Sequence, residues 1–156
     1  MNLGYGQTVT WDGWSGDGNW NTPTNWSTNT VPTISNDVVI PNGSSSSLGT
    51  VNINTVAFCK SLTINGGNSA NIVTITGSNS LTVSGAVTIG AGSGSGDAKF
   101  INVNAGSLSC GSVAIADPAN NNRRNGLRLS SGTIEVSGNI TMSSTFNDIL
   151  FSGSGL

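Results

Sequence analysis

The chain has 156 residues, of which 35% are hydrophobic and 8% are charged, with seven Asp plus Glu against five Lys plus Arg. So few charges exclude a charge-rich disordered segment, and because the basic residues form no stripe, nucleic acid is not expected as a partner. No apolar run approaches the roughly 20 residues of a membrane-spanning helix, so no transmembrane segment is expected. The 22 glycines and the Ser, Thr and Asn tracts indicate β-structure with many turns.

Residues 1–6 form a short arm with two interpretations. Gly4 and Gly6 precede Gln7 with the small-x-small spacing of a signal-peptidase site, which is typical of the end of a signal peptide. An ordinary start followed by a flexible arm fits the same residues.

Residues 7–41 form a head that contains all four tryptophans. Val38 and Ile40 stand 24 residues before Leu62 and Ile64, so the head closes with the first turn of the repeat that follows. The exposed first turn of a solenoid needs a cover, and large aromatic residues suit that purpose. We therefore predict a Trp-rich N-terminal cap.

The same head offers a second hypothesis, a platform that binds glycans. Its indoles would stack on pyranose rings while carboxylate and amide groups hold the hydroxyls. The candidate ligand-binding residues are Trp11, Trp14, Trp20, Trp26, Asp12, Asp17 and Asn19. A calcium loop fits poorly, because the spacing lacks the regular oxygens and the closing Glu, so no metal or cofactor is expected.

Residues 42–156 are a repeat that ends within a turn. Its units begin 25, 27, 26 and 22 residues apart, at Val56, Leu81, Leu108, Ile134 and Leu156. Apolar residues recur at every second position, with Gly or Ser at the breaks. We predict an all-β fold, a right-handed parallel β-helix of about 22–27 residues per rung. Because the last unit stops early, we expect the chain to be the front part of a longer protein.

Each rung is predicted to contain three short strands with bends between them. The best-defined rung has Phe100 to Val103, then Leu108 and Cys110, then Val113 and Ile115. Variable segments follow the third strand, and such segments often meet a partner. They are Gly90 to Asp97, Asp117 to Asn125 and Ser143 to Asn147.

Stacked rungs predict two inward columns of apolar side chains. The first contains Phe58, Val83, Cys110 and Val136, and the second contains Ile64, Ile89, Ile115 and Met142. In this alignment Cys59 points outward and Cys110 is a small buried residue. No disulfide is expected between them, because two rungs would place them roughly 9–10 Å apart.

An enzyme of the polysaccharide lyase or hydrolase type is the alternative to a binding protein. The chain has no His, and its carboxylates form no pair of the kind that glycoside hydrolysis needs. Glu135 is expected to face outward beside Thr82, Ser109 and Ala57, without an acidic neighbour. Arg123, Arg124 and Arg128 resemble a lyase's basic site but fit a solvated face better. We therefore expect no catalysis.

An ice-binding solenoid is a further alternative. Thr63, Thr88 and Thr141 would occupy one outward column, which Ala114 interrupts. Threonine also favours solvent-facing strand positions in general, and that explanation is sufficient here.

The head resembles a known group of proteins. The residues that carry this likeness are Trp11-Asp-Gly13, Gly18-Asn-Trp20, Asn25-Trp26, Val31-Pro32 and Asn36-Asp-Val-Val-Ile-Pro41. They are similar to the opening of exported surface proteins of the Bacteroidota, where it precedes β-helical or other repetitive adhesin regions. The resemblance implies export by the type 9 secretion system, and the group includes gliding-motility adhesins.

Together these observations predict a non-catalytic adhesin or structural module, extracellular or at the cell surface. Expected partners are other parts of the same long polypeptide, surface glycans, and cell-surface or secretion proteins. A β-helical polysaccharide-active enzyme or a carbohydrate-binding module is the alternative.

Overall fold

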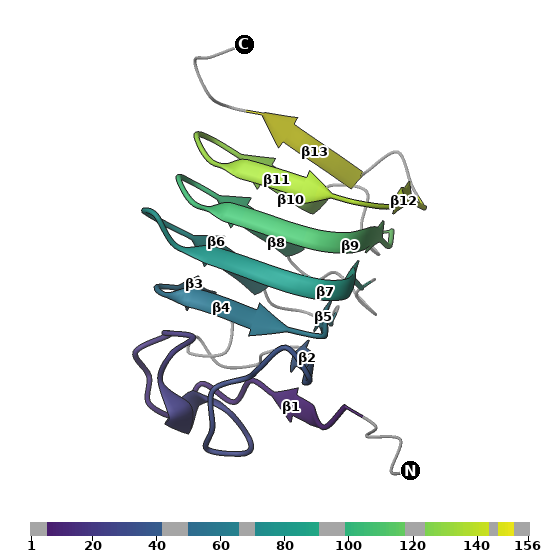
Figure 1. Ribbon diagram of the computed structural model, residues 1–156. Helices are drawn as coiled ribbons and strands as arrows, with labels where there is room; N and C mark the ends of the chain where they lie inside the picture. The colour runs from purple at the N-terminus through teal and green to yellow at the C-terminus, as the bar shows by residue number, and fades with distance from the viewer. Residues whose placement is uncertain are drawn as a thin grey trace.

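The computed structural model describes residues 6–41, 50–65, 71–90, 99–117, 124–143 and 147–151. Figure 1 shows these segments as a stack of coils that rises from the N-terminal part of the chain to β13. All paired strands in the described ranges run parallel to one another. The predicted parallel β-helix is therefore confirmed.

Two sheets form the walls of the helix. Within the described residues the larger has eight strands: β1 (Thr8–Thr10), β2 (Asp37–Ile40), β5 (Ser61–Ile64), β7 (Ser80–Ile89), β9 (Ser107–Ile115) and β11 (Thr133–Val136) in spatial order, with β4 (Val56–Cys59) on β7 and β12 (Ile140–Met142) on β9. The smaller has five: β3 (Thr50–Ile53), β6 (Asn71–Ile75), β8 (Lys99–Val103), β10 (Asn125–Leu129) and β13 (Asn147–Phe151). A 3-10 turn, η1 (Pro23–Asn25), lies in the cap.

The rungs are less divided than the sequence suggested. In β7 and β9 the predicted second and third strands join into one long strand, whereas the rungs below and above keep them separate as β4 with β5 and β11 with β12. The bends are shaped by close stacking. A Cβ added at Gly85 would lie 2.9 Å from the Lys60 carbonyl oxygen, and one at Gly111 would lie 2.9 Å from the Gly85 carbonyl oxygen. Glycine lets each bend rest on the one below.

Alternating side chains point into the space between the sheets and form the core. Along β7, Leu81, Val83, Val87 and Ile89 are all buried. Backbone register stacks these residues on equivalent positions of the neighbouring rungs. The second predicted column is in register throughout, although its last member, Met142, is half exposed.

The first predicted column contains an error at Phe58. Cys59, not Phe58, pairs with Val83 and is buried, while Phe58 is 42% exposed. Between Cys59 and Leu62 the bend has two residues, but between Val83 and Val87 it has three, and the register shifts there. The sequence alignment placed the difference of one residue within β4 instead of in the bend, so it exchanged the inward and outward faces of β4. The inward column is Cys59, Val83, Cys110 and the half-buried Val136.

Asparagine side chains stabilise one corner of the helix, and no sequence pattern predicted this role. Asn71 and Asn125 begin their strands and are buried. The Asn71 amide donates to the Pro41 and Asn65 carbonyls (both 3.1 Å), and the Asn125 amide donates to the Ala116 carbonyl (3.1 Å). Such bonds satisfy backbone groups that leave the sheet at the corner. Asn125 was predicted to lie in a variable loop, so that boundary was wrong.

The remaining predicted variable segments lie mainly outside the described residues. No helix in the described ranges is long and apolar enough to cross a membrane.

A matched pair of substitutions tests the register of β4. Cys59→Asp places a carboxylate in the apolar core, so we expect it to lower the free energy of unfolding by about 3 kcal/mol or more. Phe58→Asp changes a partly exposed residue and should cost less than about 1 kcal/mol. Urea denaturation followed by circular dichroism measures both. A larger loss for Phe58→Asp would contradict the register.

Candidate functional site

The segment between β1 and β2 folds beneath the first rung as a cap (Figure 1). On β1, the Thr10 N–H donates to Ser27 Oγ (3.0 Å), and the Ser27 N–H donates to the Thr10 carbonyl (2.8 Å). On β3, the Trp20 N–H donates to the Asn52 carbonyl (2.9 Å), and the Asn52 N–H donates to the Gly18 carbonyl (2.8 Å). The cap therefore pairs with the first strand of both sheets and satisfies their edges.

Three of the four tryptophans form the base of the cap. Trp26 packs edge to face against Trp11 and Trp20, with ring centroids 4.9 Å and 4.6 Å apart. Its indole N–H donates to the Trp20 carbonyl (2.7 Å). All three side chains are 0% exposed, so protein covers the ring faces that a sugar would need. Their place is in the core.

Asp17 organises the polar layer of the cap. Its Oδ1 accepts hydrogen bonds from Ser15 Oγ (2.8 Å), the Asn19 N–H (2.9 Å) and Asn25 Nδ2 (2.6 Å), and its Oδ2 accepts one from Thr22 Oγ1 (2.6 Å). These bonds, with that from Thr22 the strongest cause and that from Asn19 the next, hold the pKa of Asp17 well below its usual range. The carboxylate is an internal anchor instead of the free sugar ligand that was predicted.

Asn25 connects this polar layer to the tryptophan base. It is fully buried and precedes Trp26 in the chain. Its Nδ2 also donates to the Asn19 carbonyl (3.0 Å), while its Oδ1 accepts from the Ser15 N–H (3.0 Å) and Ser15 Oγ (2.6 Å). Asn25 was named in the sequence only as part of the resemblance and not as a site residue, and its position beside Trp26 was the available signal.

Trp14 and Asp12 remain at the surface. Trp14 is 85% exposed, and its backbone N–H donates to Asp12 Oδ1 (3.1 Å). Asn19, the last predicted site residue, is half-buried and contributes its backbone to the Asp17 network. Three of the seven predicted site residues are thus buried tryptophans. Asp17 and Asn19 are hydrogen-bonded within the cap, and Trp14 and Asp12 leave an indole and one carboxylate oxygen open to solvent.

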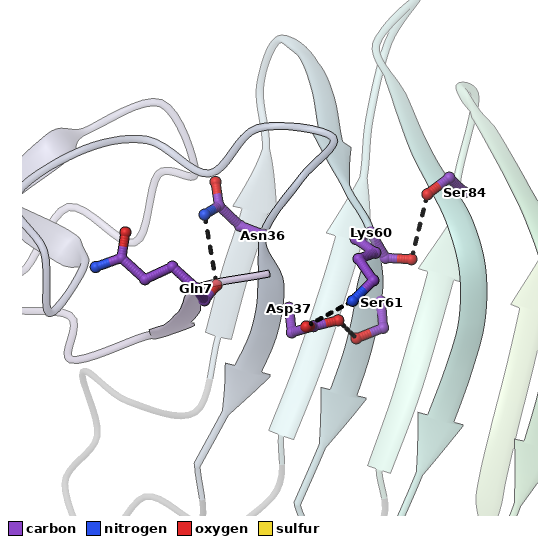
Figure 2. A network of polar contacts seen from close by, with 6 residues as sticks. All are labelled: Gln7, Asn36, Asp37, Lys60, Ser61 and Ser84. Atoms are coloured by element: carbon purple, nitrogen blue, oxygen red, sulfur yellow. Dashed lines mark hydrogen bonds and ion pairs between the residues drawn. The ribbon is translucent and has the colours of Figure 1, made fainter. Parts of the chain in front are cut away.

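A second polar network joins the cap to the first rungs (Figure 2). Asp37 Oδ1 accepts from Ser61 Oγ (2.6 Å), and its Oδ2 lies 3.1 Å from Lys60 Nζ. The Ser61 hydroxyl first, and Lys60 second, lower the pKa of Asp37. The Asn36 amide donates to the Gln7 carbonyl (3.4 Å), and Ser84 Oγ lies 3.5 Å from the Lys60 carbonyl. This network crosslinks successive strands.

The other candidate catalytic and metal-binding groups of the described residues do not lie together at one site. Glu135 faces outward on β11 in a column with Ser109 and Thr82. That column ends in Phe58 and not in Ala57 as predicted, because Ala57 is buried. In the part of the chain that the structure describes, no three His, Cys, Asp or Glu side chains could hold a metal ion.

The arginines are engaged with neighbours on the outer surface of the smaller sheet. Arg124 forms an ion pair with Asp148 on β13 (2.7 Å), and the Arg128 guanidinium lies 3.4 Å from the centre of the Phe100 ring. Arg123 and Asp97 lie outside the described residues.

Both cysteines are free and buried; burial was predicted for Cys110, whereas Cys59 was predicted to point outward. Burial, with a smaller effect of the Asp37 charge, raises the pKa of Cys59 to about 12, and burial also raises the pKa of Cys110. Neither is a reactive thiol. Thr63, Thr88, Ala114 and Thr141 share one outward column, as predicted.

An apolar groove of about 450 Å³ lies where the cap meets the larger sheet. Its lining is Pro32, Thr33, Ile34, Phe58 and Thr82. This groove was not predicted from the sequence, because the predicted register placed Phe58 in the core.

Residues 10–144 match the family described as Domain of unknown function (DUF8693). The chain belongs to this family. The DUF8693 match runs from β1 past β12, so it contains both the cap and the stacked rungs. No curated protein and no solved structure matches the chain.

The Asp17 network predicts a pH-dependent cap. The pKa of Asp17 is depressed in the folded state, so its stabilising effect is complete above the unfolded value near pH 4 and declines as the pH falls through the folded value. We expect Asp17→Ala to lower the melting temperature by about 3–8 °C at pH 7 and by less at pH 2.5. Thermal melts monitored by tryptophan fluorescence measure this. An equal loss at both pH values would contradict the charged network.

The burial of the indoles predicts which tryptophan a quencher reaches. Trp14→Phe should remove most of the acrylamide-accessible emission, because Trp14 alone among the four side chains is largely exposed. Trp20→Phe, the matched control, should leave that accessible fraction in place. Stern–Volmer plots at pH 7 distinguish them, and similar residual quenching in the two variants would show that the base of the cap is open.

Proposed function

We propose that this domain is a non-catalytic adhesive and structural module of a secreted or cell-surface protein. The observation that carries the proposal is that the polar groups of the domain bond to one another within the fold. Asp17 and Asn25 hold the cap, Asp37 and Lys60 join strands, and Arg124 pairs with Asp148. These groups stabilise a rigid stack and do not converge on a reacting centre.

The outer surface of the larger sheet supports the proposal. Its outward columns contain mainly small polar side chains, such as Ser80 with Ser107 and Thr82 with Ser109, in parallel register. A regular surface of this kind suits contact over a broad area more than enclosure of a small substrate. The cap provides the rigidity of the first rung, which a load-bearing surface module requires.

The proposed location follows from the resemblance of residues 4–41 to exported surface proteins of the Bacteroidota. That resemblance also supports type 9 export, and a role in surface attachment or gliding motility. The proposed partners are surface glycans, cell-surface or secretion proteins, and other parts of the same polypeptide.

A bead-detachment assay tests the proposed function. Beads coated with the folded protein should resist shear flow over surfaces coated with bacterial or plant polysaccharides, several-fold better than beads coated with heat-denatured protein. The same polysaccharides should show no release of reducing ends or unsaturated products. Turnover, or adhesion equal to that of the heat-denatured protein, would refute the proposal.

A further inference from the structure

We propose that Trp14 and Asp12 form a contact point for neutral polysaccharides at the tip of the cap. This inference rests on the proposed adhesive function and names a ligand class and a site for it. The buried tryptophans and Asp17 are excluded from this site, because protein contacts already occupy their ring faces or carboxylate oxygens.

Hydrogen bonds fix the backbone on both sides of Trp14. The Asp12 and Gly13 N–H groups both donate to the Asn25 carbonyl, at 2.9 Å and 3.3 Å. On the other side of Trp14, the Ser15 N–H donates to Asn25 Oδ1, and the Gly16 N–H closes a turn onto the Gly13 carbonyl (3.0 Å). Gly13 and Gly16 adopt positive φ angles of 62° and 74°, which this turn requires.

The fixed backbone lowers the entropic cost of binding a ligand at Trp14. A large side chain on a pre-ordered backbone loses little conformational freedom when a ligand covers it, so most of its burial energy becomes affinity. Three tryptophans of the cap are fully buried, whereas Trp14 keeps 85% of its surface in water. Nothing in the packing of the described residues requires an indole at this position.

The chemistry of Trp14 and Asp12 favours a sugar as the ligand. The C–H face of a pyranose ring is apolar and weakly positive, so it complements the negative face of an indole. Asp12 is exposed, and of its two oxygens only Oδ1 takes part in a hydrogen bond within the described residues. Its Oδ2 can accept hydrogen bonds from sugar hydroxyls beside the stacked ring.

The negative charge of the cap narrows the class of sugar ligand further. Residues 6–41 contain Asp12, Asp17 and Asp37 and neither Lys nor Arg, and Lys60 offsets the charge of Asp37 alone. A surface of this kind repels uronic acids, sulfated glycans and anionic lipid headgroups. Neutral glucans, mannans and xylans carry the required hydroxyls and ring faces without that repulsion.

Calorimetric titration with neutral hexasaccharides of β-1,4-glucan, β-1,3-glucan, mannan and xylan tests the proposal. At least one should bind with a Kd below about 1 mM. Trp14→Ala should weaken that binding about tenfold or more. Asp12→Asn should weaken it less, about threefold, because asparagine keeps the acceptor for the Trp14 N–H but replaces the charged Oδ2 acceptor by an amide NH2 donor, which can still bond to a sugar hydroxyl oxygen.

Ile34→Ala is the matched control, since Ile34 is another exposed apolar residue of the cap. It should leave the affinity unchanged. Absence of binding to all four sugars, or equal affinity in Trp14→Ala, would overturn the inference. So would Trp14-dependent binding to alginate or to phosphatidylserine vesicles in place of the neutral sugars.

The bead assay and the titrations together distinguish failure of the Trp14 site from failure of the proposed adhesive function. If Trp14→Ala beads resist flow as well as the parent, and the hexasaccharides do not bind, the module is adhesive through another surface. If parent beads do not adhere at all, the adhesive function itself fails, whatever the titrations show.

Discussion

Parallel backbone pairing between successive rungs is the interaction on which the rest of this structure depends. It aligns the inward columns, and it also leaves the first strand of each sheet without a partner on one side. The cap resolves that problem at both sheets, through Ser27 on β1 and through Gly18 and Trp20 on β3. The head is therefore part of the helix, and the family match, which covers both, agrees with this unity.

The cap combines an apolar base with a polar layer that cannot be separated from it. Trp11, Trp20 and Trp26 fill the space under the first rung, and Asn25 beside them is buried with both ends of its amide bonded. Because a buried amide is costly without partners, this network is satisfied only when the loop from Ser15 to Thr22 is in place. Loop order and tryptophan packing thus support each other.

Periodicity in the sequence was sufficient to predict the fold. It was not sufficient to predict which side chains of each strand point inward, because that depends on the length of each bend. Val38 and Ile40 were assigned correctly because their 24-residue spacing to Leu62 and Ile64 has no gap. Phe58 and Cys59 were exchanged because one extra residue in the bend of β7 looks the same in sequence as one extra residue in a strand. Asn71 and Asn125 were missed, since asparagine beside a turn usually indicates solvent and here forms buried corner bonds.

The candidate site was predictable as a region but not by residue, and the reason is physical. All four tryptophans have similar neighbours in sequence, so only the folded cap distinguishes the indoles that fill it from the one that leaves it. Trp11 and Trp26 form a backbone bridge, and the Trp20 N–H bonds to the Asn52 carbonyl, which draws their side chains inward. Trp14 lies in the turn closed by Gly13 and Gly16, where the chain reverses away from the core. A tryptophan with no packing role on a turn this well ordered is better explained by contact with another molecule than by folding.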